Sequence, residues 1–83
     1  MYEKSTEQGD ALAQFSLGAM YYNGDGVKQY YAKALLLYEK SANQGNALAQ
    51  NNLMAMYYEG QGVKQDYAKA LYWYEKSNFK YIN

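Results

Sequence analysis

Apolar and small residues recur at helical spacing across the middle of the chain. From Tyr31 they fall at intervals of three and four residues, as on one side of an amphipathic helix: Tyr31, Ala34, Leu35, Tyr38 and Ala42. After a short polar turn, Asn46 is suited to cap a second helix. The inner side of that helix carries Ala49, Gln50, Leu53, Met54 and Tyr57. The pattern predicts a helix over 31–42 and another from 47 onward.

Both helices recur at an offset of 36 residues. The repeated segments are 2–5, 38–41 and 74–77; 11–14 and 47–50; 19–22 and 55–58; and 26–29 and 62–65. Roughly 60 per cent of the residues match at this offset, and periods of about 20–50 residues are typical of solenoids. In a solenoid each unit packs mainly on its neighbours. The sequence therefore predicts an array of helix pairs.

The repeat divides the chain into four parts. Residues 1–9 align with the end of a second helix and form a partial repeat, 10–45 and 46–77 are full repeats, and 78–83 form a tail. Two alternatives explain the partial repeat: the chain is a fragment of a longer array, or the half-helix covers the first full repeat.

The first full repeat is expected to begin with a helix over 11–22. Gly9 and Asp10 should end the partial helix before it and cap this one. We expect one strip of the helix to face the core, namely Ala13, Leu17 and Tyr21, and a neighbouring strip to carry Ala11, Gln14 and Gly18. The small residues of the second strip would let another helix approach closely.

Matching positions of the two repeats carry a family resemblance. The first repeat contains Leu17-Gly18, Tyr21, Gly24-x-Gly26-Val27, Lys33-Ala34, Tyr38 and Lys40, and the second contains Gly60-x-Gly62-Val63, Asp66, Lys69-Ala70 and Trp73-Tyr74. This pattern resembles the Sel1-like repeat, a relative of the tetratricopeptide repeat with a longer loop between its helices. The resemblance implies an all-α, right-handed α-solenoid of antiparallel helix pairs that binds other proteins and performs no chemistry.

Three positions depart from the family pattern. Met54, Tyr30 and Leu37 stand where the family usually has Gly, Asp and Trp, so the helices that carry them are expected to pack less tightly. Asp66, in contrast, can cap the helix that follows it.

Composition limits the partners and the compartment. The 83 residues hold eight basic and eight acidic side chains, and every basic one is Lys. Without net charge or Arg, the chain lacks the usual means of binding phosphates, so no nucleic-acid partner is expected. No apolar run approaches the about 18 residues of a membrane span, and 1–10 lack the apolar core of a signal peptide. The chain is expected to be soluble and not membrane-bound, with the cytoplasm favoured.

The sequence offers little catalytic chemistry. It has no His and no Cys, which removes the usual general base and most metal ligands, so we expect no enzyme, no metal and no cofactor. The loops Asn23-Gly24-Asp25-Gly26 and Glu59-Gly60-Gln61-Gly62 could hold a phosphate on backbone N–H groups. They lack a Gly-Lys-Ser/Thr ending and a preceding strand, so we interpret the glycines as turn residues. The 12 tyrosines are interpreted as packing residues rather than stacking platforms.

The expected binding site is the outer face of the first helix of each repeat, here named the first-helix face. Its residues are Leu12, Phe15, Ser16, Ala19 and Asn23 in the first repeat, and Leu48, Asn51, Asn52, Ala55 and Glu59 in the second. Differences between the repeats cluster on this face, and in related solenoids the first helices line the concave docking surface. We expect Phe15 to supply an apolar anchor and Asn51 and Asn52 to supply hydrogen bonds to a partner helix or extended segment.

Three functions are open at this stage. The chain could be an adaptor or scaffold for a protein partner, an immunity-type inhibitor that neutralises a bacterial toxin or effector, or an enzyme acting on a small molecule. The first is favoured.

Self-association is also expected. Two full repeats are fewer than the about three that such arrays usually need. Tyr74, Trp73, Phe79 and Ile82 would be exposed in a monomer, which predicts an end-to-end homodimer through the C-terminal helix and tail.

Overall fold

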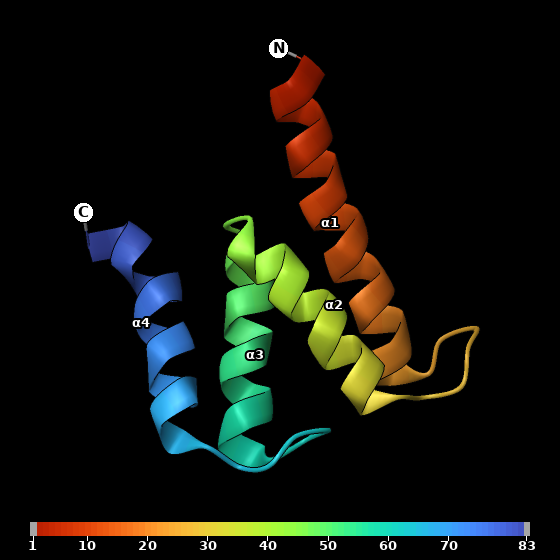
Figure 1. Cartoon of the computed structure of the whole chain (residues 1–83), viewed down its shortest axis with the longest axis vertical. Helices are drawn as coiled ribbons and strands as arrows, with labels where there is room; N and C mark the ends of the chain where they lie inside the picture. The colour runs from red at the N-terminus through yellow and green to blue at the C-terminus, as the bar shows by residue number, and fades with distance from the viewer. Residues whose placement is uncertain (1, 83) are drawn as a thin grey trace.

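Four α-helices form two antiparallel pairs (Figure 1). In the computed structural model they are α1 (Tyr2–Asn23), α2 (Tyr31–Asn43), α3 (Ala47–Glu59) and α4 (Tyr67–Ile82). The structure describes residues 2–82, with the side chains of residues 10–77. Figure 1 shows α2 and α3 in the middle of the row, between α1 and α4. The predicted all-α fold of antiparallel helix pairs is confirmed.

The hydrophobic core is centred where the two pairs meet. Tyr38 of α2 and Leu53 and Met56 of α3 are almost fully buried. Ala34 and Ala49 have no exposed surface, so small side chains stand where these helices come closest. As the helical spacing predicts, the inner sides of α2 and α3 form one continuous cluster. Stacking of one repeat on the other therefore joins the two helix pairs through one shared core.

Within the first pair, α1 and α2 approach closely at Gly18. A Cβ atom at this position would lie 2.9 Å from two ring carbons of Tyr38, nearer than van der Waals contact allows. The Ser41 hydroxyl also donates a hydrogen bond to the carbonyl oxygen of Ala11, at 2.6 Å. The absence of a side chain at Gly18 thus leaves room for the Tyr38 ring between the helices.

Side-chain caps begin two of the helices, as expected from the sequence. The Asn46 Oδ1 atom accepts a hydrogen bond from the Ala49 N–H at 2.8 Å, and Asp66 Oδ1 accepts one from the Lys69 N–H at 3.1 Å. Tyr30 precedes α2 at the position equivalent to Asp66. Its side chain makes no capping hydrogen bond and its ring is exposed. α2 therefore begins without the acceptor that α4 has.

The loop inside each pair is a glycine turn. Gly60 and Gly62 both have a φ of 73°, in the left-handed region that residues with a Cβ atom avoid. The Gly60 N–H donates to the Met56 carbonyl at 2.7 Å and so ends α3. The Gln65 Nε2 atom then donates to the Tyr58 carbonyl at 2.8 Å, which holds the loop against the end of α3. The first loop repeats this geometry, so the interpretation as turn residues is confirmed.

The predicted helix end at Gly9 and Asp10 is wrong, because α1 runs without a break from Tyr2 to Asn23. A glycine inside a helix costs only about 1 kcal/mol relative to alanine, and Asp is also tolerated there. A turn would form only if it allowed helix packing that offsets the lost helical hydrogen bonds. Residues 2–9 therefore continue the first helix of the repeat.

The inward strip predicted for α1 is also wrong. Ala13 and Leu17 are exposed and Tyr21 is only partly buried, whereas Ala11 and Gly18 of the neighbouring strip are buried. The equivalent residues of α3, Ala49, Leu53 and Tyr57, are buried as expected. The reason is that α3 lies between α2 and α4, while α1 has a neighbouring helix, α2, on one side only.

The C-terminal helix extends the second repeat. The backbone of α4 continues to Ile82, through most of the expected tail. Tyr74 is exposed as predicted. The prediction that Trp73 is exposed is wrong, because its indole is buried in the core. Phe79 and Ile82 lie outside the described side chains.

The interpretation of the tyrosines as packing residues holds for only part of them. Tyr38 and Tyr57 are buried, and Tyr21, Tyr22 and Tyr31 are partly buried. Among the described side chains, the exposed tyrosines are Tyr30, Tyr58, Tyr67, Tyr72 and Tyr74. Most of these belong to the second repeat, whose outer side has no further helix pair packed on it in this structure.

Candidate functional site

The ten residues of the first-helix face differ in exposure. The exposed ones are Leu12, Ser16, Asn23, Leu48, Asn51 and Glu59, and the partly buried ones are Phe15, Ala19, Asn52 and Ala55. The face therefore carries side chains from both repeats, but part of it already contacts the rest of the protein.

Three residues were expected to make the main contacts with a partner, and two of them contact Tyr38 instead. The ring centroids of Phe15 and Tyr38 lie 5.6 Å apart, and Phe15 is packed on the core. Burial raises the pKa of the Tyr38 hydroxyl, and a hydrogen bond with the Asn52 side chain opposes that shift. Phe15 therefore helps to hold α1 on α2, and Asn52 helps to hold the second repeat on the first. Asn51 remains available on the surface.

Leu12 and Leu48 are the large apolar side chains that this face exposes at equivalent positions. They are 57% and 58% exposed, and they stand 36 residues apart in the sequence. Neither belongs to the hydrophobic core or is packed against it. The repeat thus presents the same apolar side chain twice, while the polar positions around it differ between the two copies.

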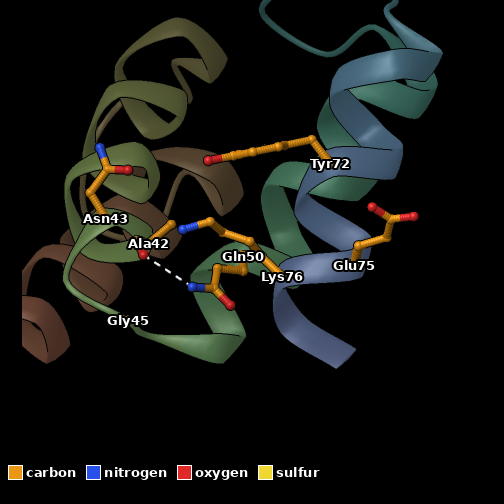
Figure 2. A pocket seen from close by; sticks show the side chains of 7 residues that line it. All are labelled: Ala42, Asn43, Gly45, Gln50, Tyr72, Glu75 and Lys76. Atoms are coloured by element: carbon orange, nitrogen blue, oxygen red, sulfur yellow. Dashed lines mark hydrogen bonds between the residues drawn. The ribbon is translucent and has the colours of Figure 1, made fainter. Parts of the chain in front are cut away.

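A pocket lined largely by polar residues lies where the end of α2 and the start of α3 meet α4 (Figure 2). Its volume is about 430 Å³, and its lining residues are Ala42, Asn43, Gly45, Gln50, Tyr72, Glu75 and Lys76. Figure 2 shows the Gln50 amide donating from Nε2 to the Ala42 carbonyl, at 3.1 Å. The Gln50 Oε1 atom is buried without a hydrogen-bond partner. Because this oxygen is buried, a molecule in the pocket could not donate a hydrogen bond to it.

The Tyr57 hydroxyl is held by a carboxylate of the first repeat. The Tyr57 hydroxyl donates to Glu39 Oε2 at 2.8 Å. Burial, followed by this hydrogen bond and the negative charge of Glu39, raises the pKa of Tyr57 to about 12. The hydroxyl therefore keeps its proton at neutral pH and acts as a hydrogen-bond donor. Among the described residues no group of three or more His, Cys, Asp or Glu side chains could hold a metal ion.

An apolar groove between α3 and α4 was not predicted from the sequence. Its volume is about 450 Å³, and it is lined by Met54, Tyr58, Tyr67, Ala70, Leu71 and Tyr74. The signal that could have revealed it is in the repeat itself. Tyr67, Leu71 and Tyr74 are equivalent to residues of the first repeat that pack against the second.

No helix within the described part of the chain is both long and apolar enough to cross a membrane.

Comparison with known proteins agrees with the repeat pattern. The Sel1 repeat model matches residues 11–46 and 47–77. One similar protein of known crystal structure is a protective antigen present in uropathogenic Escherichia coli strains, which displays an SLR fold. Its sequence is 42% identical over 95% of this chain, and the TM-score is 0.84. A Sel1 repeat protein from Oxalobacter formigenes is 36% identical over 88%, also with a TM-score of 0.84. This chain spans only 17% and 30% of those two chains. Comparison with curated proteins gives no match.

Proposed function

Because this chain belongs to the Sel1 repeat family, we propose that it is a non-catalytic module that binds a partner protein on its first-helix face. The partner supplies a helix or an extended segment with apolar side chains. Leu12 and Leu48 form the apolar part of the site. Asn51 supplies a polar contact one turn from Leu48, and Glu59 supplies one at the other end of α3.

The observation that carries this proposal is the repeated exposure of leucine. Packing within the protein does not require Leu12 or Leu48 to be apolar, because both are more than half exposed. Binding of a partner that covers exposed apolar groups is favoured by about 25 cal/mol per Å² of apolar surface buried. Two such groups on successive first helices suit a partner segment that crosses both repeats.

The test uses capture with matched leucine variants. The wild-type chain, Leu12→Ala/Leu48→Ala and Leu36→Ala are immobilised and exposed to a lysate of the source organism, and the retained proteins are identified by mass spectrometry. Leu36 is a suitable control because it is 59% exposed and lies on α2 instead of a first helix. We expect a partner that the wild type and the Leu36 variant retain and the double variant loses.

The affinity for that partner is then measured in solution. The double variant should weaken binding at least tenfold, which corresponds to about 1.4 kcal/mol. If the Leu36 variant alone weakened binding while the double variant bound normally, the assignment of the first-helix face would be wrong. Circular dichroism of the three proteins checks that all remain folded.

A further inference from the structure

The two repeats meet through specific contacts, here called the junction. The Tyr22 hydroxyl donates to Gln61 Oε1 at 2.9 Å, and a second tyrosine hydroxyl, that of Tyr57, donates to the first repeat at Glu39. Gly62 lies directly against the start of α2, since a Cβ atom on it would be 2.7 Å from the Tyr31 carbonyl carbon. The Tyr38 hydroxyl also shares a hydrogen bond with the Asn52 side chain of α3. The second repeat therefore docks on the first through tyrosine hydroxyls, one glycine and the apolar core.

The outer side of α4 repeats the docking surface that α2 offers to α3. This α4 end face consists of Tyr58, Tyr67, Leu71 and Tyr74, which line the apolar groove. Leu71 is 55% exposed, whereas its equivalent in the junction, Leu35, is 8% exposed. The end face thus has the residues of a junction without the helix that would cover them.

The outer side of α1 repeats the surface that α3 inserts into the junction. This α1 end face consists of Ala13, Leu17, Met20 and Tyr21, equivalent to Ala49, Leu53, Met56 and Tyr57. Met20 is 38% exposed, whereas Met56 is 1% exposed. Gly26 is the equivalent of Gly62, and a Cβ atom added to it would have no neighbouring atom within 4 Å. The glycine that the junction needs for close approach is therefore present at this end too, facing open space.

We propose that a second copy of this chain docks head to tail, with the α1 end face of one copy on the α4 end face of the other, in the register of the junction. In that register the Tyr58 hydroxyl of one copy donates to Asp25 of the other, as Tyr22 does to Gln61. Asp25 keeps an acceptor at this position and adds a negative charge, which strengthens a hydrogen bond. Tyr21 likewise donates to Glu75, as Tyr57 does to Glu39.

The two end faces differ from each other, so this contact is heterologous. A heterologous contact leaves one unused face at each end of a dimer, and further copies can add. This differs from a two-fold dimer through α4, in which both copies would use the same face. The proposal is independent of the partner site, because Leu12 and Leu48 belong to neither end face.

The test measures mass by sedimentation velocity over a range of protein concentrations. Leu17→Asp places a charge on the α1 end face, Leu71→Asp places one on the α4 end face, and Leu36→Asp is the control on an exposed position outside both faces. We expect the wild type and the Leu36 variant to form dimers and larger species as the concentration rises. Each end-face variant should remain monomeric at concentrations at least tenfold higher.

Mixing the two end-face variants distinguishes the symmetry. The Leu17 variant keeps a working α4 end face and the Leu71 variant keeps a working α1 end face, so an equimolar mixture should form dimers and nothing larger. A wild type that stays monomeric at millimolar concentration would overturn the proposal. So would a Leu17 variant that associates like the wild type, or a mixture that stays monomeric. If either variant loses its helical circular dichroism signal, Met20→Lys and Tyr67→Lys replace them on the same two faces.

Discussion

Tyr38 and Tyr74 are equivalent residues of the two repeats, yet one is 1% exposed and the other 47%. Both follow the same spacing on the second helix of a pair. Tyr38 is enclosed by α1, through Phe15 and Gly18, and by α3, through Asn52. The first repeat thus closes over a ring that the second repeat leaves open.

Two differences account for this contrast. Within residues 2–82, no helix pair covers the outer side of α4 as α3 covers α2. In addition, Met54 stands where the first repeat has Gly18, and a side chain there prevents the ring of Tyr74 from taking the place that Tyr38 occupies. Repeats of nearly the same sequence therefore acquire different interiors through their neighbours and through one small residue.

The largest expected difference in stability is between alanine variants of two equivalent leucines, one in each repeat. Leu53 is fully buried and Leu17 is 40% exposed, although they are equivalent. Leu53→Ala should lower the free energy of unfolding by about 2–5 kcal/mol, because it leaves a cavity in the junction. Leu17→Ala should cost less than about 1 kcal/mol. Urea denaturation at dilute concentration measures both, and equal costs would contradict the packing described for α1.

A smaller difference in stability is expected between variants of two glycines with the same backbone conformation. Gly26 and Gly62 have φ values of 74° and 73°, so alanine at either should cost about 1–2 kcal/mol in strain. Only Gly62 lies against Tyr31. Gly62→Ala should therefore destabilise the chain by about a further 1–3 kcal/mol, as overpacking does. Comparing the two thermal denaturation curves isolates the contribution of the junction, and identical curves would argue against a close approach at Gly62.

The smallest expected effect concerns the start of α2. Tyr30→Asp gives this helix the cap that Asp66 gives α4, and it should raise the free energy of unfolding by about 0.5–1.5 kcal/mol. The exposed Tyr30 ring has little packing to lose. Asp66→Ala is the reciprocal variant and should cost about 1 kcal/mol. A destabilised Tyr30→Asp protein, seen in chemical denaturation, would mean that the ring supports a neighbouring residue.

Features set by neighbouring residues along the chain could be predicted from the sequence. The Asn46 and Asp66 caps and the glycine turns follow from short-range hydrogen bonding and allowed backbone angles. The repeat period likewise predicted the helix pairs, and the resemblance to the Sel1 family is confirmed.

Features that depend on a distant helix could not be predicted. Periodicity shows that Leu17 lies on an apolar strip, but burial requires another helix to pack on that strip. The same holds for Phe15 at the expected site. Its position opposite Leu17 suggested an exposed anchor, whereas contact with Tyr38 through the gap at Gly18 places it against the core. Spacing within one helix carries no information about which side the next helix occupies.

The thinness of the molecule determines how its parts can open. Its principal extents are 38 × 34 × 14 Å, so the shortest is close to the about 10–12 Å diameter of one helix. Helices in a single layer have neighbours only along the row, and local unfolding can begin at either end without breaking the middle. Amide hydrogen exchange should accordingly be slowest in α2 and α3 and become faster toward both ends. A partner that spans both repeats would raise the protection of the outer helices most, because these have the most order to gain.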